Sequence, residues 1–283
     1  MTSPMQEQER FERAVAVETK GEHGGPLTED ETWLVRWVIP AITLPYFYAV
    51  LPFRLRRRYR VPRDGDIHRV PSDAPDAAPA LPPEADAAIA ALAREGFATL
   101  EHVVERGAFG RPLRVVVLGH PAEPHVGYVT IAGARAQVIA AVALDTEWRD
   151  GTRTHTWTGP FSPPGARADV DVVWIRDPRD AVELLAVHRM RCARRARAGA
   201  QALTTWRDAP LASYARGRRE GIEASVRAGR SEATPDGLEV RPTRRGALLG
   251  AWRNLFPTYH VLRWLAWRQG ARELRAVREG RRE

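Results

Sequence analysis

The stretch LDTEWRDGTRTHTWTG, Leu144–Gly159, contains the strongest strand and turn signals in this chain. Polar residues alternate with apolar or β-branched ones on both sides of Asp150-Gly151, a pair that is typical of two-residue hairpin turns. A two-residue turn predicts these cross-strand pairs: Arg149 with Thr152, Glu147 with Thr154, and Thr146 with His155. In that register Asp145 and Glu147 lie on one face of the sheet and His155 lies on the other.

Similar β-branched and aromatic runs lie on both sides of this hairpin. They are FATLEHVVE (97–105), LRVVVLG (113–119), HVGYVTI (125–131), AQVIAAVAL (136–144) and VDVVWI (170–175). Because the connections are too short for helical crossovers, we expect a mainly antiparallel meander from about Phe97 to Ile175.

After Asp177-Pro178 the pattern becomes helical. The stretch 180–199 places Ala181, Leu185, His188 and Cys192 on one helix face, so we expect a buried, inert thiol. Further helices are expected over 82–93, 209–228, 243–256 and 258–277. The predicted fold class is therefore α+β: C-terminal helices cover an antiparallel meander sheet, and an apolar membrane-type segment precedes it.

These patterns divide the chain into five parts. They are an acidic tail (1–32), an apolar segment with an arginine cluster (33–60), a Pro/Ala-rich linker (61–83), a helix plus antiparallel sheet (84–178), and a basic helical region packed on the sheet (179–283).

The apolar segment decides whether the protein touches a membrane. Its uncharged part, Trp37–Phe53, would form about 26 Å of helix, against about 30 Å for a hydrocarbon core. Pro40, Pro45 and Pro52 interrupt it. We expect it to span the bilayer or to lie in its interface. The alternative that stays open is a soluble cytoplasmic protein that buries this segment against the C-terminal apolar segment.

Tryptophan, tyrosine and arginine mark two segments as membrane-contacting, because indole and phenol rings prefer the headgroup region and arginines attract anionic lipid. The expected contact residues are Trp33, Trp37, Tyr46, Tyr48, Arg54, Arg56, Arg57, Arg58, Arg60, Trp252, Trp264 and Trp267. The C-terminal segment carries too many charges to span, so we expect an amphipathic helix there, lying in the interface or packed on the first segment.

The most metal-like pattern is the turn GHPAEPH, with His120, Glu123 and His125. Two imidazoles and a carboxylate bind zinc or iron where their donor atoms converge. The alternative is an exposed loop between two strands, which we favour. A second polar group, Asp145, Glu147, Asp150 and His155, is expected to be a solvated sheet face whose members do not act together.

Other chemistry finds little support in the sequence. It has no GxSxG, phosphate-loop or GxGxxG motif, and its single cysteine excludes an intramolecular disulfide. We expect no cofactor. The net charge is +8, with the excess of arginine in the C-terminal third, but these arginines are spread over several helices. We therefore expect lipid rather than nucleic acid as their partner.

Three stretches together resemble a family of uncharacterised bacterial proteins with an N-terminal membrane segment. They are LDTEWRDGTRTHTWTG, ELLAVHRMRCARR, and VRPTRRGALLGAW leading into LFP. The resemblance implies an anchor joined to a cytoplasmic α+β domain, and it implies no reaction, ligand or catalytic residue.

The expected function is membrane-associated binding or scaffolding without catalysis, at the cytoplasmic side of a bacterial inner membrane. An anionic lipid surface is the expected partner, and a protein partner stays open as an addition to it. Two alternatives stay open: a metal-dependent enzyme that uses His120, Glu123 and His125, and a soluble cytoplasmic nucleic-acid-binding protein that uses the basic C-terminal third.

Overall fold

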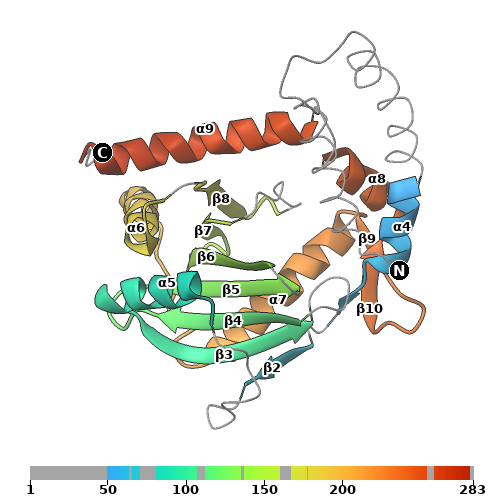
Figure 1. Ribbon diagram of the computed structural model, residues 1–283, viewed down its shortest axis with the longest axis horizontal. Coiled ribbons are helices and arrows are strands. Elements are labelled where there is room, and N and C mark those ends of the chain that lie inside the picture. The colour runs from blue at the N-terminus through green and yellow to red at the C-terminus, as the bar shows by residue number, and fades with distance from the viewer. Residues whose placement is uncertain are drawn as a thin grey trace, which may run out of the picture. The chain divides into compact units, whose positions relative to one another are not determined.

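All six predicted strand segments lie in one sheet of the computed structural model (Figure 1). The structure describes residues 50–63, 66–70, 81–106, 112–134, 137–159, 167–176, 178–253 and 258–280. The chain divides into two units, Met1–Pro52 and Phe53–Glu283. The described sheets and helices belong to the second unit, apart from the start of helix α4 (Leu51–Arg58).

The main sheet has seven strands in the order β2-β3-β4-β5-β6-β7-β8. They are β2 (Ile67–Arg69), β3 (Ala98–Arg106), β4 (Pro112–Gly119), β5 (Val126–Ala134), β6 (Gln137–Glu147), β7 (Arg153–Trp157) and β8 (Val170–Trp174). The predicted antiparallel meander is confirmed from β3 to β7. It is wrong at β8, which pairs with β7 in parallel. At the other edge, β2 joins the sheet from within the range predicted to be a linker.

The β6–β7 hairpin differs from its predicted register by one residue. The observed pairs include Asp145 with His155, Thr146 with Thr154, and Leu144 with Thr156. The loop has three residues instead of two: Trp148 N donates to Thr152 O, and Gly151 N donates to Trp148 O, each at 2.9 Å. Gly151 has a φ of +80°, the left-handed conformation that such a bulged loop requires.

This shift matters because one residue of slippage moves every side chain to the opposite face. Thr154 and Thr156 join Thr146 on one face of the sheet, and His155 joins Asp145 on the other. The predicted separation of Asp145 from His155 is therefore wrong, and His155 Nδ1 is hydrogen-bonded to Asp145 Oδ1.

Helices cover both faces of the sheet (Figure 1). On one side lie α5 (Pro83–Arg94), α6 (Ala181–Arg197) and α9 (Thr258–Arg278). Their buried residues, among them Leu92, Leu184, Leu185 and Leu274, pack with Leu144. The hairpin thus shares one core with Leu184 and Leu185 of α6. Burial of each such side chain stabilises the fold by roughly 1.5–3 kcal/mol.

On the opposite face, α7 (Pro210–Arg227) covers a second core. Leu211 and Tyr214 of this helix, with Trp206 just before it, pack on Val115 and Val117 of β4. The run of consecutive valines in β4 reflects this double coverage, because neighbouring residues point to opposite faces and both faces are buried.

A smaller sheet is formed by β1 (Val61–Pro62), β10 (Glu239–Pro242) and β9 (Ser231–Ala233). Helix α8 (Arg244–Arg253) follows β10 and begins where it was predicted to begin. Thr243 caps it, because its Oγ1 accepts a hydrogen bond of 2.9 Å from Gly246 N.

The described residues include only the end of the predicted membrane segment, from residue 50 onward. Within the described ranges, none of the helices combines the length and the apolar character needed to cross a bilayer. Trp33, Trp37, Tyr46 and Tyr48 lie outside the described residues.

Candidate functional site

A cluster of buried polar side chains lies between the sheet and α6. His125 Nδ1 lies 2.7 Å from Thr146 Oγ1, which lies 2.9 Å from His188 Nε2. Cys192 Sγ is 3.4 Å from the same hydroxyl and 3.6 Å from His188 Nε2. All four side chains are buried, so the described part of the protein encloses this cluster.

Local structure explains how these residues meet. His188 and Cys192 are four residues apart on α6 and therefore share one helix face. Thr146 points to the same side from β6, and His125 ends the turn that precedes β5. Thr156 of β7 lies on this face because of the three-residue hairpin loop, and its Oγ1 is 3.0 Å from His188 Nδ1.

Burial keeps the titratable members of the cluster uncharged. It lowers the pKa of His125 to about 4 and holds the pKa of His188 far below its ordinary value. It raises the pKa of Cys192 to about 11. At neutral pH the cluster therefore contains two neutral imidazoles and a thiol.

The surrounding charges fix the direction of the hydrogen bonds. Arg191 Nη1 donates to Thr156 Oγ1 at 2.5 Å, which leaves the Thr156 hydroxyl hydrogen free to be donated to His188 Nδ1. At the other end, His125 Nε2 lies 3.4 Å from the carboxylate of Glu123 and must carry a proton to face it.

These two constraints assign the tautomers. With Nδ1 as acceptor, His188 donates from Nε2 to Thr146 Oγ1. Thr146 in turn donates to His125 Nδ1, while the Cys192 thiol donates to the remaining lone pair of Thr146. One continuous chain of hydrogen bonds thus runs from Arg191 to His125, whose Nε2 faces the Glu123 carboxylate at 3.4 Å.

The predicted metal candidates of the GHPAEPH turn are placed as follows. His120 Nδ1 accepts hydrogen bonds from Ala122 N and Glu123 N, at 3.2 and 2.8 Å. Its Nε2 is 4.0 Å from Glu123 Oε1. Arg189 Nε donates to Glu123 Oε2 at 2.9 Å. Burial would raise the pKa of Glu123, but the hydrogen bond and the charge of Arg189 lower it further than burial raises it.

The donor atoms that do gather belong to a different set. Among the described residues, His125, His188 and Cys192 have possible metal-ligating atoms within 4.8 Å of one another. The sequence analysis named His125, His188 and Cys192 separately and did not predict that they form one cluster. His125 and His188 are brought together only by the tertiary fold. The spacing of His188 and Cys192 on α6 was the one signal that the sequence offered.

The acidic side chains of the opposite sheet face are largely engaged with basic ones. Glu147 Oε2 accepts from Arg216 Nη2 at 2.8 Å, and Glu105 Oε2 accepts from Arg218 Nε at 2.9 Å. Of the group predicted to be solvated, Asp145, Glu147 and His155 are half-buried and Asp150 is exposed.

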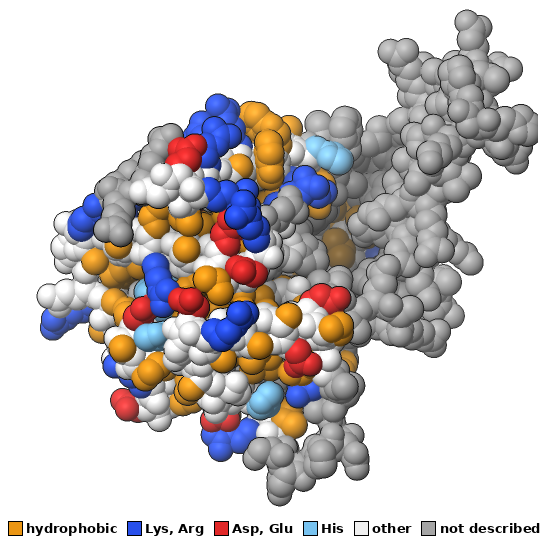
Figure 2. All heavy atoms as spheres, turned by 60° about the vertical axis from the view of Figure 1, so that its left-hand side comes forward, with side chains coloured by type: hydrophobic (Ala, Val, Ile, Leu, Met, Phe, Trp, Pro, Cys, Tyr) orange, Lys and Arg blue, Asp and Glu red, His pale blue; other side chains and the backbone are white. Residues whose placement is uncertain are grey.

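A second candidate site is an exposed apolar surface on α8 and α9. Six of its side chains are 43–52% exposed: Leu248, Trp252, Val261, Trp264, Leu265 and Trp267. We call this set the α8–α9 surface. Figure 2 shows hydrophobic and arginine side chains side by side at the top of the view, where α9 lies.

The surface arises from the helical period of α9. Val261, Trp264 and Leu265 are spaced by three and four residues, so they lie on the side of α9 that faces away from the buried Gly270 and Leu274. The guanidinium of Arg268 lies 5.3 Å from the centre of the Trp264 ring. Large apolar side chains and positive charge thus share one helix side.

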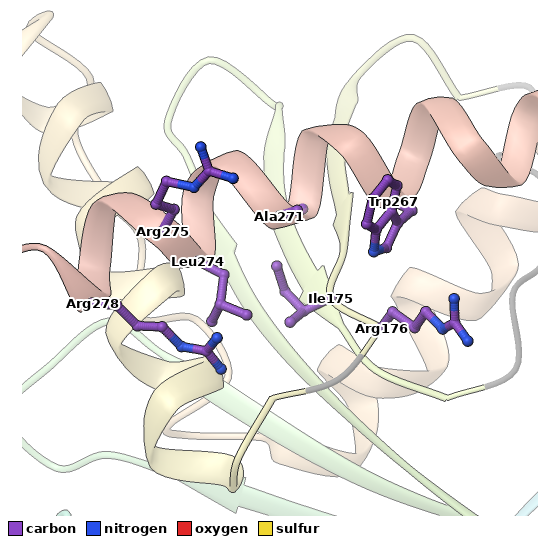
Figure 3. A pocket seen from close by; sticks show the side chains of 8 residues that line it. Ile175, Arg176, Trp267, Ala271, Leu274, Arg275 and Arg278 are labelled. Atoms are coloured by element: carbon purple, nitrogen blue, oxygen red, sulfur yellow. The ribbon is translucent and has the colours of Figure 1, made fainter.

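A groove of about 290 Å³ lies beside this surface, between α9 and the end of β8. Ile175, Leu274 and Ala271 form its apolar part, and Arg176 and Arg278 lie at opposite ends with Trp267 above (Figure 3). Arg278 is bound to Glu183 through two hydrogen bonds, of 2.6 and 3.0 Å.

The arginine cluster after the apolar segment is partly engaged within the protein. Arg56 Nη2 donates to Glu232 Oε1 at 2.9 Å, and Arg60 Nη1 donates to Glu239 Oε2 at 3.4 Å. Arg57 lies over the ring of the exposed Phe53, 5.4 Å from its centre. At least two of the five arginines expected to contact lipid therefore already have acidic partners.

No protein-family model, curated protein or solved structure matches this chain. The resemblance to uncharacterised bacterial membrane-segment proteins stays a prediction.

Proposed function

We propose that this protein binds the surface of an anionic membrane through the α8–α9 surface. The observation that carries the proposal is the exposure of six large apolar side chains, three of them tryptophans, on two adjoining helices. Side chains of this kind are normally buried unless the surface meets a partner. Tryptophan is the side chain best suited to a lipid headgroup region, since its ring is apolar and its N–H stays solvated.

Charge complementarity supports an anionic lipid as that partner. Exposed arginines flank the apolar side chains: Arg244, Arg245, Arg268, Arg272 and Arg275. Each basic residue near an anionic surface contributes about 1 kcal/mol to binding. The groove of Figure 3 adds Arg176 beside an apolar floor, an arrangement that suits a headgroup phosphate above an acyl chain, whereas Arg278 at its other end is already paired with Glu183.

Within this proposal the sheet and its covering helices form a rigid domain that presents α8 and α9 to the lipid. The apolar segment before Arg54 would provide a second attachment, with the domain on the cytoplasmic side of a bacterial inner membrane. The function is binding or scaffolding at that surface, without a reaction of its own.

Co-sedimentation with vesicles tests the proposal directly. Full-length protein is mixed with vesicles of phosphatidylcholine alone or with added phosphatidylglycerol, at low and high salt. We expect binding to the anionic vesicles, weakened by salt but not abolished, because the apolar contribution is insensitive to screening. Protein that stays in the supernatant with both kinds of vesicle would contradict the proposal.

A parallel mixture with duplex DNA separates lipid binding from the nucleic-acid alternative. DNA binding by arginines alone is lost as salt rises, because it depends on counterion release. Retention on DNA together with no binding to vesicles would favour a nucleic-acid partner for the basic C-terminal third.

A further inference from the structure

We infer that His125, His188 and Cys192 form a binding site for one thiophilic divalent metal ion, for which zinc is the natural probe. The inference is independent of the proposed membrane binding. It concerns the interior of the protein, whereas the α8–α9 surface lies outside.

The donor set is the first argument. The three side chains offer two imidazole nitrogens and a sulfur within 4.8 Å of one another. His188 Nε2 and Cys192 Sγ are 3.6 Å apart, a separation that suits two ligands of one tetrahedral zinc with Zn–N of about 2.0–2.1 Å and Zn–S of about 2.3 Å. To reach the same ion, the His125 imidazole must move toward His188 and Cys192. His125 lies at the end of a turn and not inside a strand, so this shift does not disturb the sheet.

The second argument is that the ring nitrogens facing away from the cluster also have polar partners. Histidines that bind metals usually use their other ring nitrogen to hold a carboxylate, hydroxyl or carbonyl, which fixes the ring. Here His125 turns Nδ1 into the cluster and Nε2 toward Glu123, at 3.4 Å. His188 turns Nε2 into the cluster and Nδ1 toward Thr156, at 3.0 Å. Both rings are therefore held with one nitrogen aimed at a common centre.

Thr146 provides a fourth donor at the same place. Its Oγ1 lies 2.7–3.4 Å from the donor atoms of His125, His188 and Cys192. In the metal-free protein this hydroxyl connects the three ligands by hydrogen bonds. With a metal bound, it would complete a four-coordinate N₂SO shell or give way to a water molecule.

The chemistry of binding selects the class of metal. One thiolate and two imidazoles favour zinc and similar thiophilic ions over magnesium or calcium, which prefer oxygen ligands. Binding breaks the S–H bond of Cys192 and forms a metal–sulfur bond, and the proton leaves to the solvent. The His188 proton moves from Nε2 to Nδ1, where it is donated to Thr156, so that Nε2 is free for the metal.

The positive charges nearby are compensated within the protein. Arg191 Nη2 lies 2.8 Å from Asp171 Oδ2, and Arg189 is bound to both Glu95 and Glu123. A divalent ion that gains one thiolate would add a single positive charge to the cluster. It would tie α6 to the turn before β5 and stabilise the packing of that helix on the sheet.

Reconstitution with cobalt and zinc tests the inference. Because the site is enclosed, the full chain is unfolded with chelator and reductant, and then refolded with one equivalent of either metal. Cobalt bound to a thiolate gives an intense near-ultraviolet charge-transfer band, and Cys192 is the only cysteine of the chain, so any such band reports on this residue. We expect this band, one zinc per chain by elemental analysis, and a higher midpoint of thermal unfolding with zinc.

Variants identify the other ligands. C192S should abolish the charge-transfer band, and H188Q should lower the bound zinc at least tenfold. H68Q is the matched control, because His68 is exposed and its partner is Asp66; it should bind as the unaltered protein does. Refolded wild-type protein that shows no charge-transfer band and only trace zinc would overturn the inference. Equal zinc content in wild type, C192S and H188Q would also overturn it, since the metal would then be bound elsewhere.

Discussion

Gly270 of α9 lies directly against the backbone of Trp174 in β8. A Cβ atom added to Gly270 would be 2.1 Å from the Trp174 carbonyl oxygen, far inside van der Waals contact. Gly270 is buried, and its helix carries two of the three exposed tryptophans of the α8–α9 surface, Trp264 and Trp267. This close approach lets α9 pack directly on the edge strand of the sheet.

We expect G270A to push α9 away from β8 and to lower the free energy of unfolding by about 1–3 kcal/mol, the usual cost of overpacking. G221A is the matched control. Gly221 is in the interior of α7, and nothing lies within 4 Å of a Cβ added there. Alanine at that position should be neutral or should stabilise by up to about 1 kcal/mol, from helix propensity. Urea unfolding of both variants measures the difference, and equal midpoints would contradict the role of Gly270.

Thr156 links α6 to the sheet through one hydroxyl. Its Oγ1 is bonded to His188 Nδ1 and to Arg191 Nη1, both on α6. T156V keeps the side-chain volume and leaves two buried polar groups short of a partner, so we expect a loss of about 1–3 kcal/mol per unsatisfied group in unfolding free energy. T130V on β5 is the control, because no side-chain hydrogen bond of Thr130 is found among the described residues; it should change stability little. If T156V and T130V unfold at the same urea concentration, the buried chain of hydrogen bonds contributes nothing measurable.

The metal-free protein should lose stability as the pH falls below about 6.5. Burial lowers the pKa of His125 to about 4 and that of His188 well below its ordinary value, whereas the unfolded chain protonates both near 6.5. Between these values the unfolded state binds more protons, so the free energy of unfolding decreases by up to about 1.4 kcal/mol per pH unit for each histidine. Urea unfolding at pH 7.5 and 5.0, with chelator present, measures the slope. H125Q should reduce it, and a stability that is independent of pH across this window would refute the account of the buried imidazoles.

Arginines on the outer side of α9 should supply the salt-sensitive part of lipid binding. Arg272 and Arg275 are exposed, and neither has an acidic partner among the described residues. We expect the double variant R272E/R275E to bind phosphatidylglycerol vesicles at least tenfold more weakly at low salt, through lost attraction and new repulsion. R219E is the control, since Arg219 is an exposed arginine on α7. An equal loss for R219E would mean that net charge, and not the position of the charge, controls binding.

Local sequence patterns were enough to predict strands β3 to β8 and helices α5 to α9, but not β1, β2 or β9. The β-branched run in LRVVVLG and the helical period of 180–199 depend only on neighbours along the chain, and β4 and α6 lie where these patterns placed them. The loop at Asp150-Gly151 was predicted one residue too short, because this pair suits both two-residue and three-residue hairpin loops. The choice depends on which face of β7 must meet α6, and that is a tertiary property.

The same limit applies to the candidate sites. The pairing of His188 with Cys192 follows from one helix, but their meeting with His125 requires the sheet to bring β5 and β6 under α6. The parallel pairing of β8 and the coverage of the second sheet face by α7 likewise depend on the path of the chain in space. The exposed tryptophans of α9 were predicted to contact lipid from their residue type, and the structure adds that Trp264 and Trp267 are half exposed.

The partition of a W264S/W267S double variant onto anionic vesicles is the most direct test of the proposed membrane binding. L238S is its control, because Leu238 is 71% exposed but lies between β9 and β10, away from α9. We predict that W264S/W267S binds at least tenfold more weakly than wild type at high salt, where apolar contacts dominate, and that L238S binds as wild type does. Equal partition of all three proteins would contradict the claim that the α8–α9 surface meets lipid.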